Sequence, residues 1–279
     1  MDPFSPEGEL LNIHTAMVQA QYTSVLNDYS TSNRLPYDEV IGSISDSDAR
    51  STPDLAAVRT YASYLQKPSA SAVQEAERLA EKEGDNLSVQ LLCGTILARA
   101  EKAEQALQLL AKHTGSLDAV ALTVQIHLLQ NRTDLALQQA KSARSFAQDA
   151  LLVNLAESWV GMRQGGEQYQ KAFYVFEELA QSPASASAMS LVAQAVTELH
   201  LGRVEEAETA LNAALEMEPE NATALANKVV LDAVMGRDMV EARSKLERVD
   251  KEHEILADIM AKREAFQAAM AKYSPKFEP

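Results

Sequence analysis

The stretch AMSLVAQAVTELHLGRVEEAETALNAALEMEP, residues 188–219, has the pattern of two amphipathic helices joined by a tight turn. Ala195 and Ala207 are small residues on the apolar faces of the two expected helices, where they allow close antiparallel packing. Gly202 lies between the helices, and glycine readily takes the left-handed conformation that ends a helix. Pro219 ends the second helix because it lacks the amide hydrogen needed to continue it. The stretch therefore predicts one helical hairpin.

The small residue at Ala207 recurs along the chain in every expected second helix. The matching residues are Ala76, Ala106, Ala136, Ala172, Ala207 and Ala242. Their average spacing of about 33 residues is close to the ~34 of tetratricopeptide repeats and below the ~40 of HEAT and armadillo repeats. We therefore predict an all-α fold, an α-solenoid of tetratricopeptide-like antiparallel helix pairs.

Three segments differ in composition. Residues 1–31 space their apolar residues at helical intervals and predict an N-terminal helical hairpin. Residues 32–52 are rich in Ser, Asp and Asn, which predicts an irregular connector. Residues 53–279 predict one continuous solenoid of superhelical repeats with C-terminal capping helices. That solenoid starts with a capping residue, Thr52, followed by Pro53 in the first turn.

Composition and charge exclude several classes of function. The chain has 279 residues, of which 46% are hydrophobic, and a formal net charge of −15. Such a charge repels phosphate backbones and anionic lipid surfaces, so we expect no nucleic-acid partner. Cys93 is the lone cysteine, which is typical of a reducing compartment. No apolar run approaches the ~18 residues of a membrane span, and we expect a cytoplasmic protein with no integral membrane segment.

No pattern of catalysis is present in the sequence. The histidines are scattered and do not pair with Cys, Ser or carboxylates at a recognisable spacing. Gly165 and Gly166 are not followed by Lys-Ser or Lys-Thr, so they do not form a phosphate-binding loop. We assign no catalytic, cofactor-binding or metal-binding residue and expect a protein that is not an enzyme.

A solenoid of helix pairs has a concave surface, onto which positions 2, 5, 9 and 12 of each first helix are expected to point. These positions are mostly apolar, which indicates a groove that a partner fills. The predicted groove residues are Val153, Val160, Met189, Val192, Val196, Leu199, Ala226 and Val230. The alternative is that they pack against a neighbouring hairpin. A groove that clamps a terminal carboxylate would need Lys, Arg and Asn there, and these are missing.

Several segments resemble one family in particular, the epsilon subunit of coatomer, the coat of COPI vesicles. The resemblance is most specific in residues 155–160, the Gly165-Gly166-Glu167 turn and residues 172–176, and it extends from about Leu10 to Pro275. The other resembling segments are residues 55–59, 61–65, 122–126 and 132–136. The family tends to have a fuller helical hairpin where this chain has Ser30 to Thr52. Gln194 and Glu198 occupy positions that generic repeats keep apolar, which indicates a polar contact there.

The resemblance implies a non-catalytic structural subunit of the COPI coat. Members of the family bind the C-terminal region of the coatomer alpha subunit and, through it, the rest of the complex. The implied role is to stabilise the coat in Golgi-to-ER retrograde and intra-Golgi transport, at the cytosolic face of Golgi membranes and vesicles. The residues alone lead to a repeat scaffold that binds a protein segment, and a generic tetratricopeptide-repeat adaptor or co-chaperone is the alternative.

Overall fold

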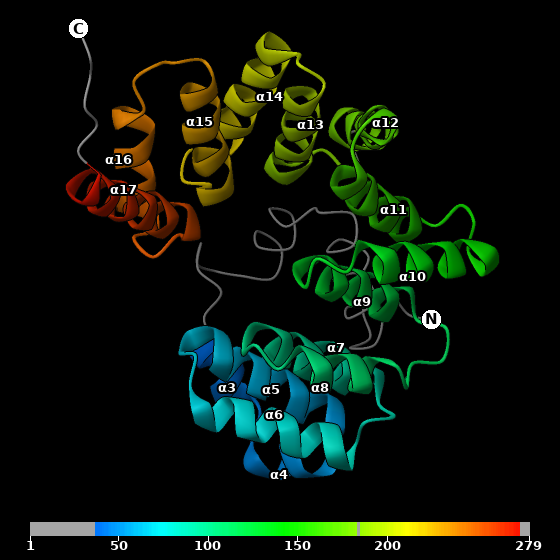
Figure 1. Cartoon of the computed structure of the whole chain (residues 1–279). Helices are drawn as coiled ribbons and strands as arrows, with labels where there is room; N and C mark the ends of the chain where they lie inside the picture. The colour runs from blue at the N-terminus through cyan, green and yellow to red at the C-terminus, as the bar shows by residue number, and fades with distance from the viewer. Residues whose placement is uncertain (1–36, 183–184, 274–279) are drawn as a thin grey trace, which may run out of the picture. The chain divides into compact units, whose positions relative to one another are not determined.

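The structure is a computed structural model that describes residues 37–182 and 185–273. Helices take up 79% of these residues, and this part of the chain contains no strand, which confirms the predicted all-α fold (Figure 1). The predicted hairpin in residues 1–31 lies outside the described residues. By their contacts the described residues form two compact units, which divide between Val175 and Phe176.

The first unit contains the helices that precede this division. They are α3 (Tyr37–Ser43), α4 (Asp46–Ser51), α5 (Pro53–Gln66), α6 (Ala70–Lys82), α7 (Leu87–Arg99), α8 (Ala103–Leu110), α9 (Leu117–Leu129), α10 (Thr133–Phe146) and α11 (Leu151–Gln164). The connector predicted as irregular in residues 32–52 therefore contains two short helices. One physical reason is a cap, since the Ser45 hydroxyl accepts a hydrogen bond from the Asp48 amide at 3.2 Å.

The second unit begins within α12, and its helices follow the same order of long helix and short turn. They are α12 (Glu167–Gln181), α13 (Ala188–His200), α14 (Val204–Met217), α15 (Ala222–Val234), α16 (Val240–Val249) and α17 (Glu254–Lys272).

Consecutive helices pack as pairs. The first helices α5, α7, α9, α13 and α15 contact the second helices α6, α8, α10, α14 and α16, respectively. First helices also pack on one another, α5 on α7, α7 on α9, α9 on α11, and α13 on α15. Within each unit, the helix pairs therefore bury apolar surface both inside a pair and against the next pair, which is the packing of a helical-repeat solenoid.

The recurring alanines are buried in the second helices. All six are in second helices, and their exposures are 0% for Ala76, Ala106, Ala136 and Ala207, 1% for Ala172 and 6% for Ala242. An alanine fills little space, so the backbones of the paired helices can approach closely there. The spacing identified in the sequence is therefore the spacing of the helix pairs.

The turns inside four pairs share one hydrogen-bonded geometry. The residue after the turn donates its amide hydrogen to the carbonyl five residues earlier, as Lys102 does to Leu97 at 2.9 Å and Arg203 to Glu198 at 2.9 Å. This Schellman-type ending requires a left-handed residue just before the donor. In the turn between α13 and α14 this residue is Gly202, as predicted, with φ 77°. In the turn between α7 and α8 it is Glu101, with φ 60°. Asn131 and Gly236 complete the set.

Enlarging the buried alanine should destabilise the fold. We expect Ala207→Leu to lower the free energy of unfolding by about 1–3 kcal/mol, because overpacking forces two closely packed helices apart. Chemical denaturation monitored by circular dichroism measures the change. Ala257→Leu, at an exposed position of α17, is the matched control and should change stability little. Equal stability of both variants would contradict the close contact at Ala207.

The left-handed turn at Glu101 provides a second test. A non-glycine residue in the left-handed conformation destabilises the folded state by roughly 1–2 kcal/mol. Replacing it with glycine removes this strain, but part of the gain is lost because glycine has more conformational freedom in the unfolded chain. We therefore expect Glu101→Gly to raise the free energy of unfolding by about 0.5–1 kcal/mol. Gln108→Gly, at an exposed position inside α8, should lower it by about 1 kcal/mol instead. A loss of stability in both variants would contradict the backbone strain at Glu101.

Candidate partner-binding surface

Four of the predicted groove residues lie in the cores of the described units. Val153 and Val160 on α11 are each 1% exposed and belong to the cluster formed by α9, α10 and α11. Val192 on α13 and Ala226 on α15 are 4% and 6% exposed. Their assignment to an open groove is therefore corrected, because neighbouring helices of the same chain cover these positions.

The other four predicted residues keep contact with solvent on α13 and α15. Met189 and Val230 are 43% and 39% exposed, whereas Val196 and Leu199 are half-buried against the core of the α13–α14 pair. Val196 and Val230 occupy the same position in successive repeats, 34 residues apart. Because α13 packs beside α15, these apolar side chains belong to adjacent helices. We call Met189, Val196, Leu199 and Val230 the α13–α15 face.

A polar contact lies inside the same repeat, as the sequence indicated. Gln194 donates a hydrogen bond from Nε2 to Oε1 of Glu198 at 3.0 Å. Glu198 is only 4% exposed, and its Oε2 has no hydrogen-bond partner within the described part of the chain. Burial raises the pKa of the Glu198 carboxyl against the lowering effect of the Gln194 hydrogen bond, and the negative charges of Glu206 and Glu177 add to the rise.

The next repeat carries an ion pair at the equivalent positions. Lys228 and Asp232 correspond to Gln194 and Glu198, 34 residues later, and Lys228 Nζ lies 2.6 Å from Asp232 Oδ1. Lys228 also lies 3.2 Å from Glu208 Oε1 on α14, and Arg237 contacts the same oxygen at 2.5 Å. A comparison of the sequence with itself at an offset of 34 would have revealed this pair. Neither residue is at a position expected to point into the groove, because both side chains lie on the core side of α15, 19% and 9% exposed.

The side chains most suited to chemistry are buried and poorly activated. Burial raises the pKa of the Cys93 thiol to about 12, so the nucleophilic thiolate is scarce at neutral pH. Burial also lowers the pKa of His127, and the positive charge of Arg132 lowers it further. Within residues 37–182 and 185–273, no three His, Cys, Asp or Glu side chains gather to hold a metal ion. In the same residues no helix has the length and apolar character of a membrane span.

Paired helices, buried packing alanines and an exposed apolar face define the class of tetratricopeptide-like repeat scaffolds. Solved structures with this fold support the classification. A tetratricopeptide repeat protein from Parabacteroides merdae is similar with a TM-score of 0.59 and 12% identity, over 81% of this chain and 97% of that chain. The APC/C hetero-tetramer Cut9–Hcn1 contains a chain that is similar with a TM-score of 0.57 and 14% identity, over 92% of this chain and 55% of that one.

Sequence comparison then identifies the family. The family model for the coatomer epsilon subunit matches residues 10–274. Coatomer subunit epsilon-1 of Arabidopsis thaliana is 30% identical over 238 residues, which cover 83% of this chain and 80% of the relative. The probable coatomer subunit epsilon of Schizosaccharomyces pombe is 30% identical over 232 residues, 82% of this chain and 77% of the relative. The chain belongs to the coatomer epsilon subunit family.

The raised pKa of Glu198 predicts a pH-dependent stability. The folded state favours the protonated carboxyl, so this contribution is fully present below the ordinary Glu pKa and is lost as pH rises through the folded-state pKa. Glu198→Gln cannot ionise, and it should therefore be more stable than the original chain at pH 7. The difference should shrink as pH falls toward 4.5, the ordinary value for Glu.

Thermal unfolding across this pH range measures the effect. Glu216→Gln, at an exposed position of α14, is the matched control and should show no comparable change in the stability difference with pH. A Glu198→Gln variant that is less stable than the original chain at pH 7 would show that the fold requires the ionised carboxylate.

Proposed function

We propose that this chain is a non-catalytic structural subunit of the COPI coat that binds the C-terminal region of the coatomer alpha subunit. Through that subunit it joins the rest of the coatomer complex and stabilises the coat for Golgi-to-ER retrograde and intra-Golgi transport. It acts in the cytoplasm and associates peripherally with Golgi membranes and COPI vesicles. Membership of the coatomer epsilon family supports the role in the coat.

The observation that carries the binding proposal is the α13–α15 face. Met189 and Val230 expose 43% and 39% of their surfaces to water, and Val196 and Leu199 continue the apolar surface as half-buried neighbours. Covering apolar surface with a partner is favourable because it removes that surface from water. A permanent neighbour in a multi-subunit coat would cover these residues, and exposed apolar residues that gather on one face are typical of protein interfaces.

The alternative is an adaptor or co-chaperone that binds a short peptide. Such a repeat protein would use free Lys, Arg or Asn side chains to hold a terminal carboxylate. Lys228, the lysine of α15, is instead paired with Asp232 and Glu208 on the core side of the helix. This arrangement favours apolar docking of a large partner over capture of a charged peptide end on these helices.

The test is a charged substitution on the face. We expect Val230→Glu to abolish co-purification of the coatomer alpha subunit's C-terminal region, because an unpaired carboxylate would be buried in the interface. Such burial costs several kcal/mol, which is about a hundredfold or more in affinity. The free chain should keep its helicity, since Val230 is exposed without the partner.

Val240→Glu is the matched control. Val240 is 65% exposed on α16 and does not belong to the α13–α15 face, so binding should persist. Retained binding by Val230→Glu would contradict docking on this face. Loss of binding by both variants would mean that the effect comes from added negative charge in general and not from the position.

A further inference from the structure

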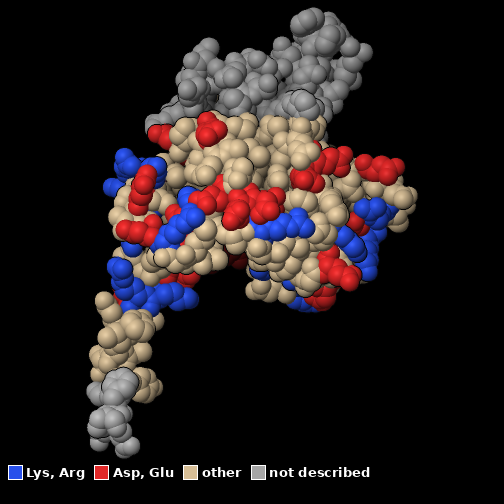
Figure 2. Space-filling model, turned by 90° about the horizontal axis from the view of Figure 1, so that it is seen from above, with Lys and Arg blue, Asp and Glu red and all other residues tan. Residues whose placement is uncertain are grey.

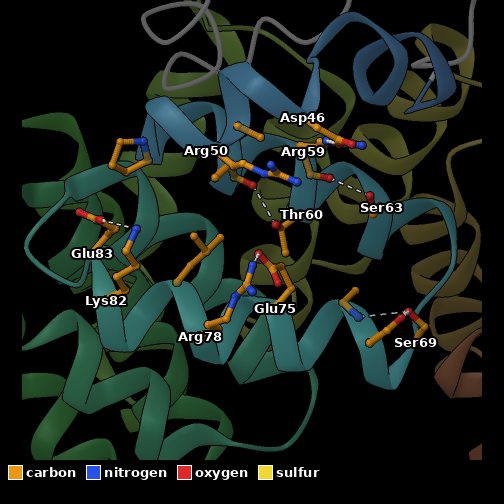
Figure 3. Close-up of a pocket in the computed structure, with 16 residues that line it drawn as sticks. Asp46, Arg50, Arg59, Thr60, Ser63, Ser69, Glu75, Arg78, Lys82 and Glu83 are labelled. Carbon is orange, nitrogen blue, oxygen red and sulfur yellow. Dashed lines mark hydrogen bonds and ion pairs between the residues drawn. The ribbon is translucent and has the colours of Figure 1, made fainter.

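A second surface feature of the first unit has no role in the proposed function. It is a cleft of about 750 Å³ between α5 and α6, closed on one side by α4 (Figure 3). Ala56, Ala72 and Leu79 contribute buried apolar side chains to its lining. The volume lies within the ~300–1,000 Å³ range of ligand pockets. The cleft can therefore take several residues of an unfolded segment.

Cations outnumber carboxylates in this cleft. Its basic residues are Arg50, Arg59, Arg78 and Lys82, and its acidic residues are Asp46, Glu75 and Glu83. The chain as a whole has the opposite balance, with a net charge of −15. On the face in view in Figure 2, Lys and Arg side chains lie among Asp and Glu side chains. The cleft is therefore a local site of positive charge on an acidic protein.

The cations of the cleft differ in how they are paired. Arg59 pairs with Asp46, Arg78 lies 2.6 Å from Glu75, and Lys82 lies 3.3 Å from Glu83. Arg50 makes no ion pair or hydrogen bond with any residue that the structure describes, and it is exposed. Arg50 therefore offers all of its guanidinium hydrogens to a ligand.

The existing ion pairs are easily exchanged for a ligand. The side chains of Arg78 and Lys82 are 73% and 72% exposed, and both pair with residues close by in the sequence. Exposed pairs of this kind contribute only ~0–1 kcal/mol. An incoming carboxylate can therefore pair with Arg50 and draw Arg78 and Lys82 toward it at little cost in existing ion pairs.

From this geometry we propose that the cleft binds a short acidic peptide segment of another protein. Carboxylates of the segment pair with Arg50, Arg78 and Lys82, and its aliphatic carbons lie on Ala72 and Leu79. Asp46, Glu75 and Glu83 repel a compact polyanion, but they can accept hydrogen bonds from the amides of a peptide. A peptide therefore matches the mixed lining better than a free phosphate or an anionic lipid headgroup.

The test is fluorescence anisotropy on the full chain with a labelled peptide of alternating Glu and Ala. We expect saturable binding that weakens with salt, since screening reduces exposed charge pairs. The peptide in which Gln replaces Glu should not bind. Arg50→Glu and Arg78→Glu should each lower the affinity about tenfold or more, as removal of a strong charge-assisted contact does. Arg99→Glu, an exposed site on α7 outside the lining, should bind as the original chain does.

Each other outcome overturns the proposal. Equal binding of the Glu and Gln peptides, or unchanged affinity in both cleft variants, would exclude recognition of carboxylates by these side chains. Full competition by inorganic phosphate would identify a free-anion site. Sedimentation with phosphatidylserine vesicles, without binding of the Glu–Ala peptide, would identify a lipid site. Val230→Glu should leave peptide binding unchanged, which separates this test from that of the α13–α15 face.

Discussion

Close contact of paired helices at a single buried alanine is the constraint on which the rest of the structure depends. Each such alanine lies in a second helix that also packs on the next first helix in several pairs, so a wider contact at one alanine would disturb two interfaces. This close contact fixes the distance between the paired helix backbones, and most other positions of the helices can vary in residue type. The α13–α15 face and the charged cleft use these free positions on the same type of helix pair.

The fold could be predicted because its determinants are local in sequence. A turn glycine at Gly202 and helical periodicity act within one repeat, and the packing alanine recurs once in each repeat. Burial of Val192 and Ala226 could not be predicted, since periodicity gives the side of a helix but not the neighbour that covers it. The helices α3 and α4 are too short for periodicity to reveal. The cleft depends on three helices and on ion pairs whose geometry the sequence does not contain.

Equivalent interior positions carry different chemistry in successive repeats. Position 198 holds a buried carboxyl with a neutral amide partner, whereas position 232 holds a carboxylate paired with Lys228. A buried charge with a close counter-ion is tolerated, and one without it favours its neutral form. The two repeats therefore satisfy the same buried position in different ways, one with a neutral amide and the other with a lysine, although their backbones follow the same pattern of helix, turn and helix.

The neighbour-to-neighbour packing of the helix pairs bears on how the chain is made. Its contacts join residues that are near in sequence, and such topologies fold quickly because little loop entropy is lost. During synthesis at ~5–20 residues per second, a repeat of ~34 residues leaves the ribosome in roughly 2–7 s. Each newly made helix pair can then pack on the preceding pair, which has already left the ribosome. The scaffold can thus assemble in the order of translation, without waiting for the C-terminal helix α17.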